Sequence, residues 1–307
     1  MGVAGMNDVT VTRRLDDADR ANVQALLRRI ADDDGFWPLS DQLVADLEHP
    51  RDDDADRPIS VLAGGAESGP WGYAQASRRD GGWTMQVATH RAGSVTERVR
   101  TLADAVVHAV DEIGDGEIDW WVYQPGAEAD AVAAASGFAF DRDLLQMRRQ
   151  LPAERRSAVE TRAFVPGQDE SAWLAVNNRA FAAHAEQGGW TLDTVRQRTD
   201  QPWFDPNGLR LHERDGRLAA FCWTKIHDSP VRVGEIYVIG VDPDFQGLGL
   251  GRELTLAGLD HMVASGIEHA MLYVDGGNAA AKTLYDRLGF DVQRTDRAFR
   301  RASRVAQ

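Results

Sequence analysis

The chain of 307 residues contains an internal repeat, which constrains its fold more than any single motif does. A Gly-Phe pair flanked by strand-like residues occurs at Gly137-Phe138 and again, 152 residues later, at Gly289-Phe290. Two pairs of segments correspond in the same order: 71–79 (WGYAQASRR) with 218–227 (LAAFCWTKIH), and 83–91 (WTMQVATHR) with 235–243 (EIYVIGVDP). Each half therefore predicts alternating strands followed by a helix, within a strand-rich α/β unit.

The length of the chain suits two domains. We expect a first domain over residues 1–150, a charged linker over 151–160 that begins Leu-Pro-Ala-Glu-Arg-Arg, and a second domain over 161–307. No apolar run is long enough to span a bilayer, and the first ten residues lack the basic-then-apolar pattern of a signal peptide. These observations predict a cytoplasmic protein.

The composition excludes several classes of site and partner. A net charge of −14 argues against a nucleic-acid partner, because phosphate backbones require clustered Lys and Arg. Cys222 is the only cysteine, which excludes internal disulfides, and its apolar surroundings predict a buried core residue rather than a nucleophile. No His or carboxylate cluster has metal-ligand spacing, so we expect no metal. We predict a monomer that acts on small molecules, without a membrane partner.

Residues 235–252 run from an apolar strand through a glycine-rich turn into a helix. Gly247, Gly249 and Gly251 would allow backbone N–H groups to converge on phosphate oxygens at the positive end of the helix, and Arg252 adds a charge. Nucleotide-binding loops of several classes share this appearance. The turn lacks the Lys-Ser/Thr ending of a P-loop, and it is not part of a dinucleotide-binding GxGxxG.

The spacing of Gln246, Gly249 and Gly251 after a strand ending in Val-Asp-Pro resembles the acetyl-coenzyme A loop of the GNAT N-acetyltransferases. Downstream, 272–291 (LYVDGGNAAAKTLYDRLGFD) resembles the next strand and helix of that family. The resemblance implies two tandem GNAT-like domains, each a mixed twisted sheet flanked by helices, with acetyl-CoA as the acetyl donor. The coenzyme-binding residues that it implies are Ile239, Gly240, Val241, Gln246, Gly247, Leu248, Gly249, Leu250, Gly251, Arg252, Asn278, Ala279, Ala280, Ala281, Lys282 and Thr283.

The repeat predicts that the second half alone keeps the chemistry. In the register of the repeat, 94–100 (SVTERVR) lies opposite 246–252 (QGLGLGR) and contains no glycine. Trp83 lies opposite Glu235, and Ala133 lies opposite Tyr285. We therefore interpret the first half as a degenerate GNAT-like domain. Its main chain at Val87, Ala88 and Thr89 could still hold a pantetheine chain, although a pyrophosphate would lack its glycine-rich loop.

Acetyl transfer to an amine requires an oxyanion donor and a base. A backbone N–H in the strand around Ile239 to Val241 could polarise the thioester carbonyl, although VIGV also fits an ordinary buried strand. We predict Glu235 as the base that accepts the amine proton. Period-two alternation places Glu235, Tyr237, Ile239 and Val241 on one face. The alternative for Glu235 is a solvated residue at a sheet edge.

The leaving thiolate requires a proton, for which Tyr285 is our candidate. It lies about two turns into a helix that Asn278 could cap, where the GNAT family places a Tyr that reaches the sulfur. The alternative is a core aromatic residue on an amphipathic helix. Lys282, on the same helix, could contact a coenzyme phosphate or be solvated.

The segments 181–191 (FAAHAEQGGWT), 203–209 (WFDPNGL), 222–227 (CWTKIH) and 234–243 (GEIYVIGVDP) look like the mycothiol synthase family. Members of that family acetylate the cysteinyl amine of a cysteine-glucosamine-inositol pseudodisaccharide, desacetylmycothiol, in the last step of mycothiol biosynthesis. The resemblance implies that Asp41, Glu186, Lys225, Glu235 and Tyr273 bind the acceptor. The family commonly has Glu at the position of Asp41, so a shorter carboxylate here would need a bridging water or a small shift of the chain.

Two other functions fit the sequence. The first is a tandem acetyltransferase that acts on another amine, such as an aminoglycoside or a peptide N-terminus. The second is a non-catalytic acyl-CoA sensor, against which the retention of Glu235 and Tyr285 argues. His184 and His227 flank the acceptor segments and could line the pocket, although partial burial with hydrogen bonding is the favoured interpretation.

Overall fold

The computed structural model describes residues 9–49, 53, 56–64, 69–79, 81–90, 95–114, 116–182, 187–228 and 232–303. It divides into two compact units: the first unit consists of residues 1–144 and 295–307, and the second unit of residues 145–294. Strand β6 (Ala139–Gln150) begins in the first unit and ends in the second, and β12 (Asp291–Arg301) does the reverse. Each unit thus contains a short segment from beyond the predicted domain boundary.

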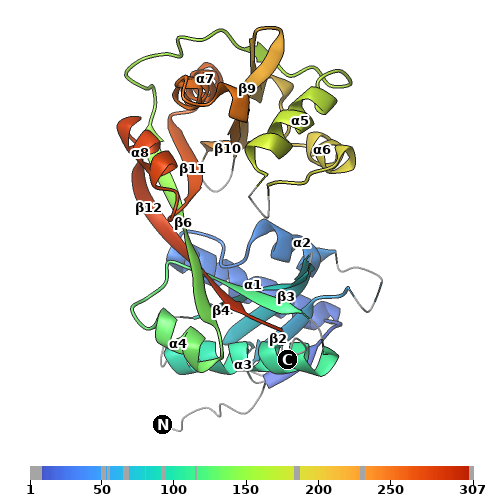
Figure 1. Ribbon diagram of the computed structural model, residues 1–307. Helices are drawn as coiled ribbons and strands as arrows, with labels where there is room; N and C mark the ends of the chain where they lie inside the picture. Colours follow the sequence, from blue (N-terminus) through green and yellow to red (C-terminus); the bar gives the residue numbers. More distant parts are fainter. Residues whose placement is uncertain are drawn as a thin grey trace. The chain divides into compact units, whose positions relative to one another are not determined.

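The sheet of the first unit has the strand order β1-β2-β3-β4-β5, followed by the second half of β12. Neighbouring strands are antiparallel except β4 and β5, which are parallel. Helices α1 and α2 pack on one face of this sheet, and α3 and α4 pack on the other (Figure 1). The bounds are β1 (Val9–Thr12), α1 (Asp17–Asp34), α2 (Asp41–Glu48), β2 (Ile59–Ala63), β3 (Gly72–Arg79), β4 (Gly82–Thr89), α3 (Val95–Ile113), β5 (Glu117–Tyr123) and α4 (Ala129–Ala135).

The second unit has the strand order β6-β11-β10-β9-β8-β7. β10 is parallel to β11 and antiparallel to β9. Helices α7 and α8 pack on one face, and α5 and α6 pack on the other. The bounds are β7 (Arg162–Ala163), α5 (Glu170–Ala180), α6 (Leu192–Thr199), η1 (Pro206–Gly208), β8 (Leu209–Arg214), β9 (Arg217–His227), β10 (Val233–Val241), η2 (Pro243–Phe245), α7 (Leu250–Ala264), β11 (His269–Asp275) and α8 (Ala279–Arg287).

The strands predicted from the repeat are confirmed. Segments 71–79 and 218–227 form most of β3 and β9, and segments 83–91 and 235–243 overlap most of β4 and β10. In each unit the second of these strands leads to a long helix, α3 or α7. The predicted α/β class, with a mixed sheet flanked by helices, is therefore also confirmed.

Residues 151–160 lie against helix α7 in the second unit. The N–H of Ala158 donates to Glu253 Oε2 at 2.7 Å, and the N–H of Ser157 donates to Asp260 Oδ2 at 2.9 Å. Arg155 forms an ion pair with Glu253. The segment predicted as a linker is therefore held by specific contacts to the helix that follows the glycine-rich turn.

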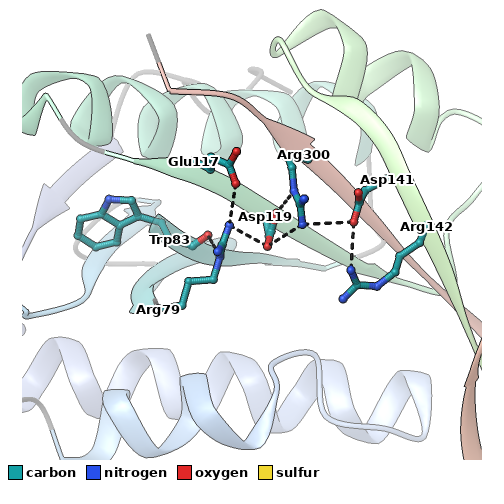
Figure 2. Close-up of polar contacts among 7 residues, drawn as sticks. All are labelled: Arg79, Trp83, Glu117, Asp119, Asp141, Arg142 and Arg300. Carbon is teal, nitrogen blue, oxygen red and sulfur yellow. Dashed lines mark hydrogen bonds and ion pairs between the residues drawn. The ribbon is translucent and has the colours of Figure 1, made fainter. Parts of the chain in front are cut away.

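An ion-pair network fixes the C-terminal strand within the first unit (Figure 2). Asp119 of β5 lies 2.9 Å from Arg79 Nη2 of β3 and 2.8 Å from Arg300 Nε of β12. Arg300 also lies 3.5 Å from Asp141 of β6, which pairs with Arg142 at 3.2 Å. The side chain of Asp119 is only 13 % exposed, so solvent screens its two ion pairs less than those of a surface carboxylate.

The chemistry of the remaining described residues is limited. Cys222 is buried beneath α7, and burial raises the pKa of its thiol to about 12, so the predicted core role is confirmed. The described residues include no helix that is both long and apolar enough to cross a bilayer. They also contain no group of three or more His, Cys, Asp or Glu side chains that could hold a metal ion.

Candidate active site

Strand β10 carries an irregularity at the centre of the second unit. Its register with β9 shifts between Ile236 and Val238, with Tyr237 as the inserted residue. A bulge of this kind reverses the alternation of side chains along a strand. Ile236 packs in the core formed with α7, whereas Val238 packs in the core formed with α5 and α6.

The bulge overturns the prediction that four side chains of β10 share one face. Tyr237 contacts the aromatic core on the α5 and α6 side, and Glu235 precedes the bulge with the same orientation. Ile239 and Val241 follow the bulge and pack toward α7. The single-face prediction is wrong because one extra residue in β10 changes the phase of every later side chain.

β10 and β11 separate immediately after Ile236. Their parallel register covers only Gly234 to Ile236, whereas β10 continues to pair with β9 as far as Val241. Across these described strands, the edge of β10 at residues 237–241 therefore has no ladder with β11. Gly240 is required for packing, since a Cβ there would lie 2.7 Å from the ring of Phe221. Main-chain donors and acceptors on this edge of β10, beyond the ladder with β11, could bind an extended ligand.

Glu235 is a buried acid rather than a residue at a sheet edge. It is 8 % exposed, on a strand with a neighbour on each side. Its Oε2 lies 2.6 Å from His227 Nε2, and its Oε1 makes no hydrogen bond with any residue in the described part of the chain. Glu235 thus has one fixed oxygen and one oxygen available to a ligand, and the solvated-edge alternative is excluded.

Aromatic and cationic groups surround this carboxylate. Lys225 is the cross-strand neighbour of Glu235, and its ammonium lies 5.0 Å from the ring centroid of Trp203. Arg198 of α6 lies 4.5 Å over Trp190 and donates a hydrogen bond to the hydroxyl of Tyr237. The sequence did not single out Arg198; its signal is an Arg within the helix that follows the predicted acceptor segment 181–191. A polar molecule bound here would contact the hydrogen-bond donors of Lys225 and Arg198, which lie against the rings of Trp203 and Trp190.

The glycine-rich turn has the backbone that its sequence predicts. Gly247 and Gly249 have φ values of 77° and 75°, in the left-handed region that favours glycine. The turn hydrogen bonds stop at the N–H of Gln246 and resume at that of Arg252. Within the described residues, the N–H groups of 247–251 have no main-chain acceptor at the start of α7. Such a row of donors at a helix N-terminus fits the pyrophosphate of coenzyme A.

Two arginines anchor this turn, and sequence reasoning missed them. Arg179 Nε lies 3.2 Å from Asp242, and its Nη2 lies 2.9 Å from Asp244. Arg217 lies 2.9 Å from the other oxygen of Asp244, and this hydrogen bond lowers the pKa of the Asp244 carboxyl. Asp242 also accepts the N–H of Asp244 at 2.9 Å. The Asp-Pro-Asp sequence was the available signal, because Asp before Pro is a helix-capping pattern.

Tyr285 lies on α8, which Asn278 caps as predicted by accepting the N–H of Ala281 at 3.0 Å. Tyr285 is 7 % exposed, and its ring lies 5.9 Å from that of Phe290. Burial raises the pKa of its hydroxyl, so the phenol remains protonated at physiological pH. That hydroxyl makes no hydrogen bond with a described residue. Lys282 donates to the carbonyl of Gly276 at 3.0 Å and braces the turn before α8.

The other predicted acceptor residues fall in different places. The hydroxyl of Tyr273 accepts hydrogen bonds from Gln146 at 2.7 Å and Arg294 at 3.3 Å. Asp41 belongs to the first unit, as the first residue of α2. Glu186 and His184 lie outside the described residues. Among the described acceptor candidates, the structure therefore brings together Glu235 and Lys225. Beside them lie His227, which the sequence placed near the pocket, and Arg198, which it did not single out.

The first unit has a cavity of about 630 Å³ at the corresponding end of its sheet. Val87, Ala88 and Thr89 line it from β4, and Trp120 and Tyr123 line it from β5. Trp83 and Ala133, at the positions opposite Glu235 and Tyr285, are fully buried. The first unit thus retains a space beside the strand end but has neither an acid nor a phenol at those two positions.

Comparison with known proteins agrees with this geometry. The model of the Acetyltransferase (GNAT) family matches residues 171–290. A mycothiol acetyltransferase of Thermomonospora curvata is 43% identical over 90% of this chain and 91% of its own length. The chain belongs to the mycothiol acetyltransferase family. A second member, from Thermobispora bispora, is 40% identical over 95% of this chain and 99% of its own length. The family resemblance seen in the sequence is confirmed, and the protein is an N-acetyltransferase.

Solved structures confirm the fold that this family membership implies. A GCN5-related N-acetyltransferase from Sphaerobacter thermophilus has a TM-score of 0.70, is 20% identical, and covers 96% of both chains. A tandem GNAT protein from the clavulanic acid biosynthesis pathway has a TM-score of 0.69, is 14% identical, and covers 96% of this chain and 99% of its own. The tandem GNAT architecture extends over nearly the whole chain.

Proposed function

We propose that the second unit transfers acetyl from acetyl-CoA to the cysteinyl α-amine of desacetylmycothiol, which completes mycothiol. The observation that supports this most directly is the buried carboxylate of Glu235, with one oxygen held by His227 and the other available beside Lys225. The names of the relatives support the choice of acceptor. The chemistry then follows from the residues around β10.

Glu235 acts as the general base in this proposal. An α-amine has a pKa of roughly 7.7–8.0, so much of the acceptor arrives protonated at neutral pH and must lose one proton before it attacks. Oε1 of Glu235 accepts that proton. The neutral nitrogen then attacks the thioester carbonyl, whose developing oxyanion accepts a hydrogen bond from the main chain at Ile239 to Val241.

Tyr285 acts as the general acid. A thiol has a pKa of about 8.5, so the departing thiolate benefits from a proton donor close to the sulfur. The raised pKa of Tyr285 keeps its hydroxyl in the donating form. When the tetrahedral intermediate collapses, the C–S bond breaks and the phenol protonates the sulfur, while the nitrogen loses its remaining extra proton to the phenolate as the amide forms. Its lack of a hydrogen-bond partner among the described residues suits a donor that acts on the substrate.

The donor and acceptor contacts extend the proposal to further residues. The N–H groups of 247–251 with Arg252, together with Gln246 and the first turn of α8 from Asn278 to Thr283, bind the pyrophosphate and its surroundings. Asp41, Glu186, Lys225 and Tyr273 bind the hydroxyl groups of the acceptor. In the first unit, the cavity beside Val87, Ala88 and Thr89 accepts a pantetheine chain without a pyrophosphate cradle.

We further propose a cytoplasmic monomer that acts on small molecules and has no nucleic-acid partner. The net charge of −14 supports the last point, because it repels a phosphate backbone. Light scattering of the purified protein measures the oligomeric state, and a mass near 33.8 kDa is the expected result.

Thiol release from acetyl-CoA tests the proposed reaction. The purified protein is given desacetylmycothiol, aminoglycosides or N-terminal peptides, and free coenzyme A is followed with a thiol reagent after subtraction of the acceptor's own thiol. Release that depends on desacetylmycothiol is the expected result. Release with another amine alone would keep the acetyltransferase but discard the acceptor. Acetyl-CoA binding without release for any amine would favour the sensor.

A further inference from the structure

His227 contacts the buried carboxylate at the centre of the site, and the mechanism above gives it no part. It is the last residue of β9, where it pairs with Val233, two positions before Glu235 on β10. Its Nε2 lies 2.6 Å from Glu235 Oε2, and its side chain is 26 % exposed. The contact joins the end of one strand to the interior of the next, on the face shared with Lys225.

The chemistry of the two groups fixes the direction of this hydrogen bond. An ionised carboxylate can only accept, so the imidazole donates from Nε2 to Oε2. No other described residue hydrogen-bonds either oxygen of Glu235. Since the terminal torsion of a Glu side chain has a broad energy minimum, the donor on Oε2 decides where Oε1 points. Without that donor, the carboxylate would rotate within its pocket.

We propose that His227 is a positioning residue that orients Glu235, so that Oε1 faces the acceptor amine while Oε2 is held. The inference rests on the proposed role of Glu235 as the base. It does not require His227 to touch the substrate. Proton transfer depends on geometry within a few tenths of an ångström, and misplacement of a base by about 1 Å can reduce the rate by 10²-fold.

The main test is the substitution His227→Phe, which keeps a ring in the position but removes the donor. We expect kcat to fall about 10- to 100-fold. The KM for acetyl-CoA should stay within about twofold of the wild-type value, because the proposed coenzyme contacts are on β10 beyond its ladder with β11 and in the turn 246–252. This division between kcat and KM would not follow from a general loss of structure.

Two further variants separate orientation from packing. His227→Gln places an amide N–H near the original Nε2, so its kcat should recover to within about fivefold of wild type. His227→Asn has the same polarity, but its amide does not reach Oε2, so its kcat should fall with that of His227→Phe. The matched control is His212→Phe, since His212 Nδ1 lies 2.8 Å from the main-chain carbonyl of Glu160 and the ring hydrogen-bonds no carboxylate among the described residues. That control should leave kcat unchanged.

The outcomes distinguish this inference from the function on which it rests. Acetyl-CoA binding and the thermal midpoint identify any variant that fails to fold, in which case the Gln and Asn variants decide the matter. An active wild type with equal kcat in His227→Phe, or with equal losses in Gln and Asn, overturns the positioning role alone. A wild type that acetylates no amine overturns the proposed function and the role of Glu235 together.

Discussion

The two units place different chemistry on the same strand register. On β10, Glu235 pairs with Lys225 of β9; on β4, Trp83 pairs with Arg78 of β3. These are the positions that the internal repeat aligns. In the first unit, the guanidinium of Arg78 lies 4.3 Å over the Trp83 ring. A cross-strand acid and cation in one unit thus correspond to a cation–π pair in the other. The strand pairing is the same in both units, but the side chains at the paired positions differ in chemistry.

The strands themselves differ in one respect. β4 pairs with β3 in a regular register from Gly82 to Thr89, whereas β10 is bulged between Ile236 and Val238. The bulge therefore accompanies the unit that keeps the acid. It leaves Tyr237 on the same face as Glu235 but turns Val238 to the core against α5 and α6 and Ile239 to the core against α7. Two strands at equivalent positions of the repeat can thus differ by one inserted residue.

The largest expected effect comes from removing the acid of the second unit, which the first unit lacks at the equivalent position. Glu235→Gln keeps the size of the side chain but removes the base, and kcat should fall about 10²- to 10⁴-fold. The measurement is steady-state acetylation of the preferred amine, with acetyl-CoA binding as a check on folding. Glu213→Gln is the control, because that carboxylate forms an exposed ion pair with Arg162. Equal rates for wild type and Glu235→Gln would refute the assignment of the base.

The next effect concerns the phenol that Ala133 replaces in the first unit. Tyr285→Phe removes only the hydroxyl, and kcat should fall about 10²-fold. Because burial raises the pKa of Tyr285, its phenol is protonated below the usual tyrosine value of about 10. Ionisation of Tyr285 should therefore cause no loss of wild-type kcat between about pH 7 and pH 9.5. A descending limb in that window that disappears in Tyr285→Phe would contradict the assignment.

A smaller effect is expected from the turn 246–252, whose glycines have no counterpart in 94–100. Gly249→Ala strains a left-handed residue by about 1–2 kcal/mol and shifts the row of N–H donors. The Kd for acetyl-CoA, measured by calorimetry, should rise about 5- to 10-fold. Gly167→Ala imposes the same strain at φ 83°, before α5 and away from the turn, so it controls for stability. Equal Kd values in the two variants would show that the turn does not bind the coenzyme.

The sequence predicted much of this arrangement because the relevant signals are local. Strand alternation located β4 and β10, the Gly spacing located the turn before α7, and Asn278 located the start of α8. These features depend on residues within one or two turns of chain. The absence of glycine from 94–100, of an acid at Trp83 and of a phenol at Ala133 was also readable, since it needed only the register of the repeat.

The remaining features depend on contacts between distant residues. The bulge in β10 has no Gly or Pro to mark it, so the prediction extended the alternation of side chains past the bulge. Arg179 and Arg217 reach the turn from other elements, and only folding brings them to Asp244. His227 was considered as a pocket residue, but its hydrogen bond to Glu235 requires the register of β9 on β10. Sequence spacing contains no information on such pairs.

The smallest expected effect on catalysis comes from weakening the first unit. Asp119→Asn removes the charge between Arg79 and Arg300, which leaves two guanidinium groups with fewer partners. The first unit should lose about 1–3 kcal/mol of its free energy of unfolding. Native-state hydrogen exchange would show this as faster exchange of the β5 and β12 amides, with the β10 amides unchanged.

The exposed pair of Asp193 and Arg196 provides the control, since Asp193→Asn should change stability by less than about 0.5 kcal/mol. If the first unit serves only as a scaffold, kcat and the KM for the acceptor should remain at wild-type values in Asp119→Asn at a temperature where the protein is folded. A selective rise in the acceptor KM would instead show that the first unit contributes to acceptor binding, as proposed for Asp41. The two units would then differ in catalysis but not in substrate recognition. The first unit can lack the acid and the phenol while its helices still present side chains to a substrate.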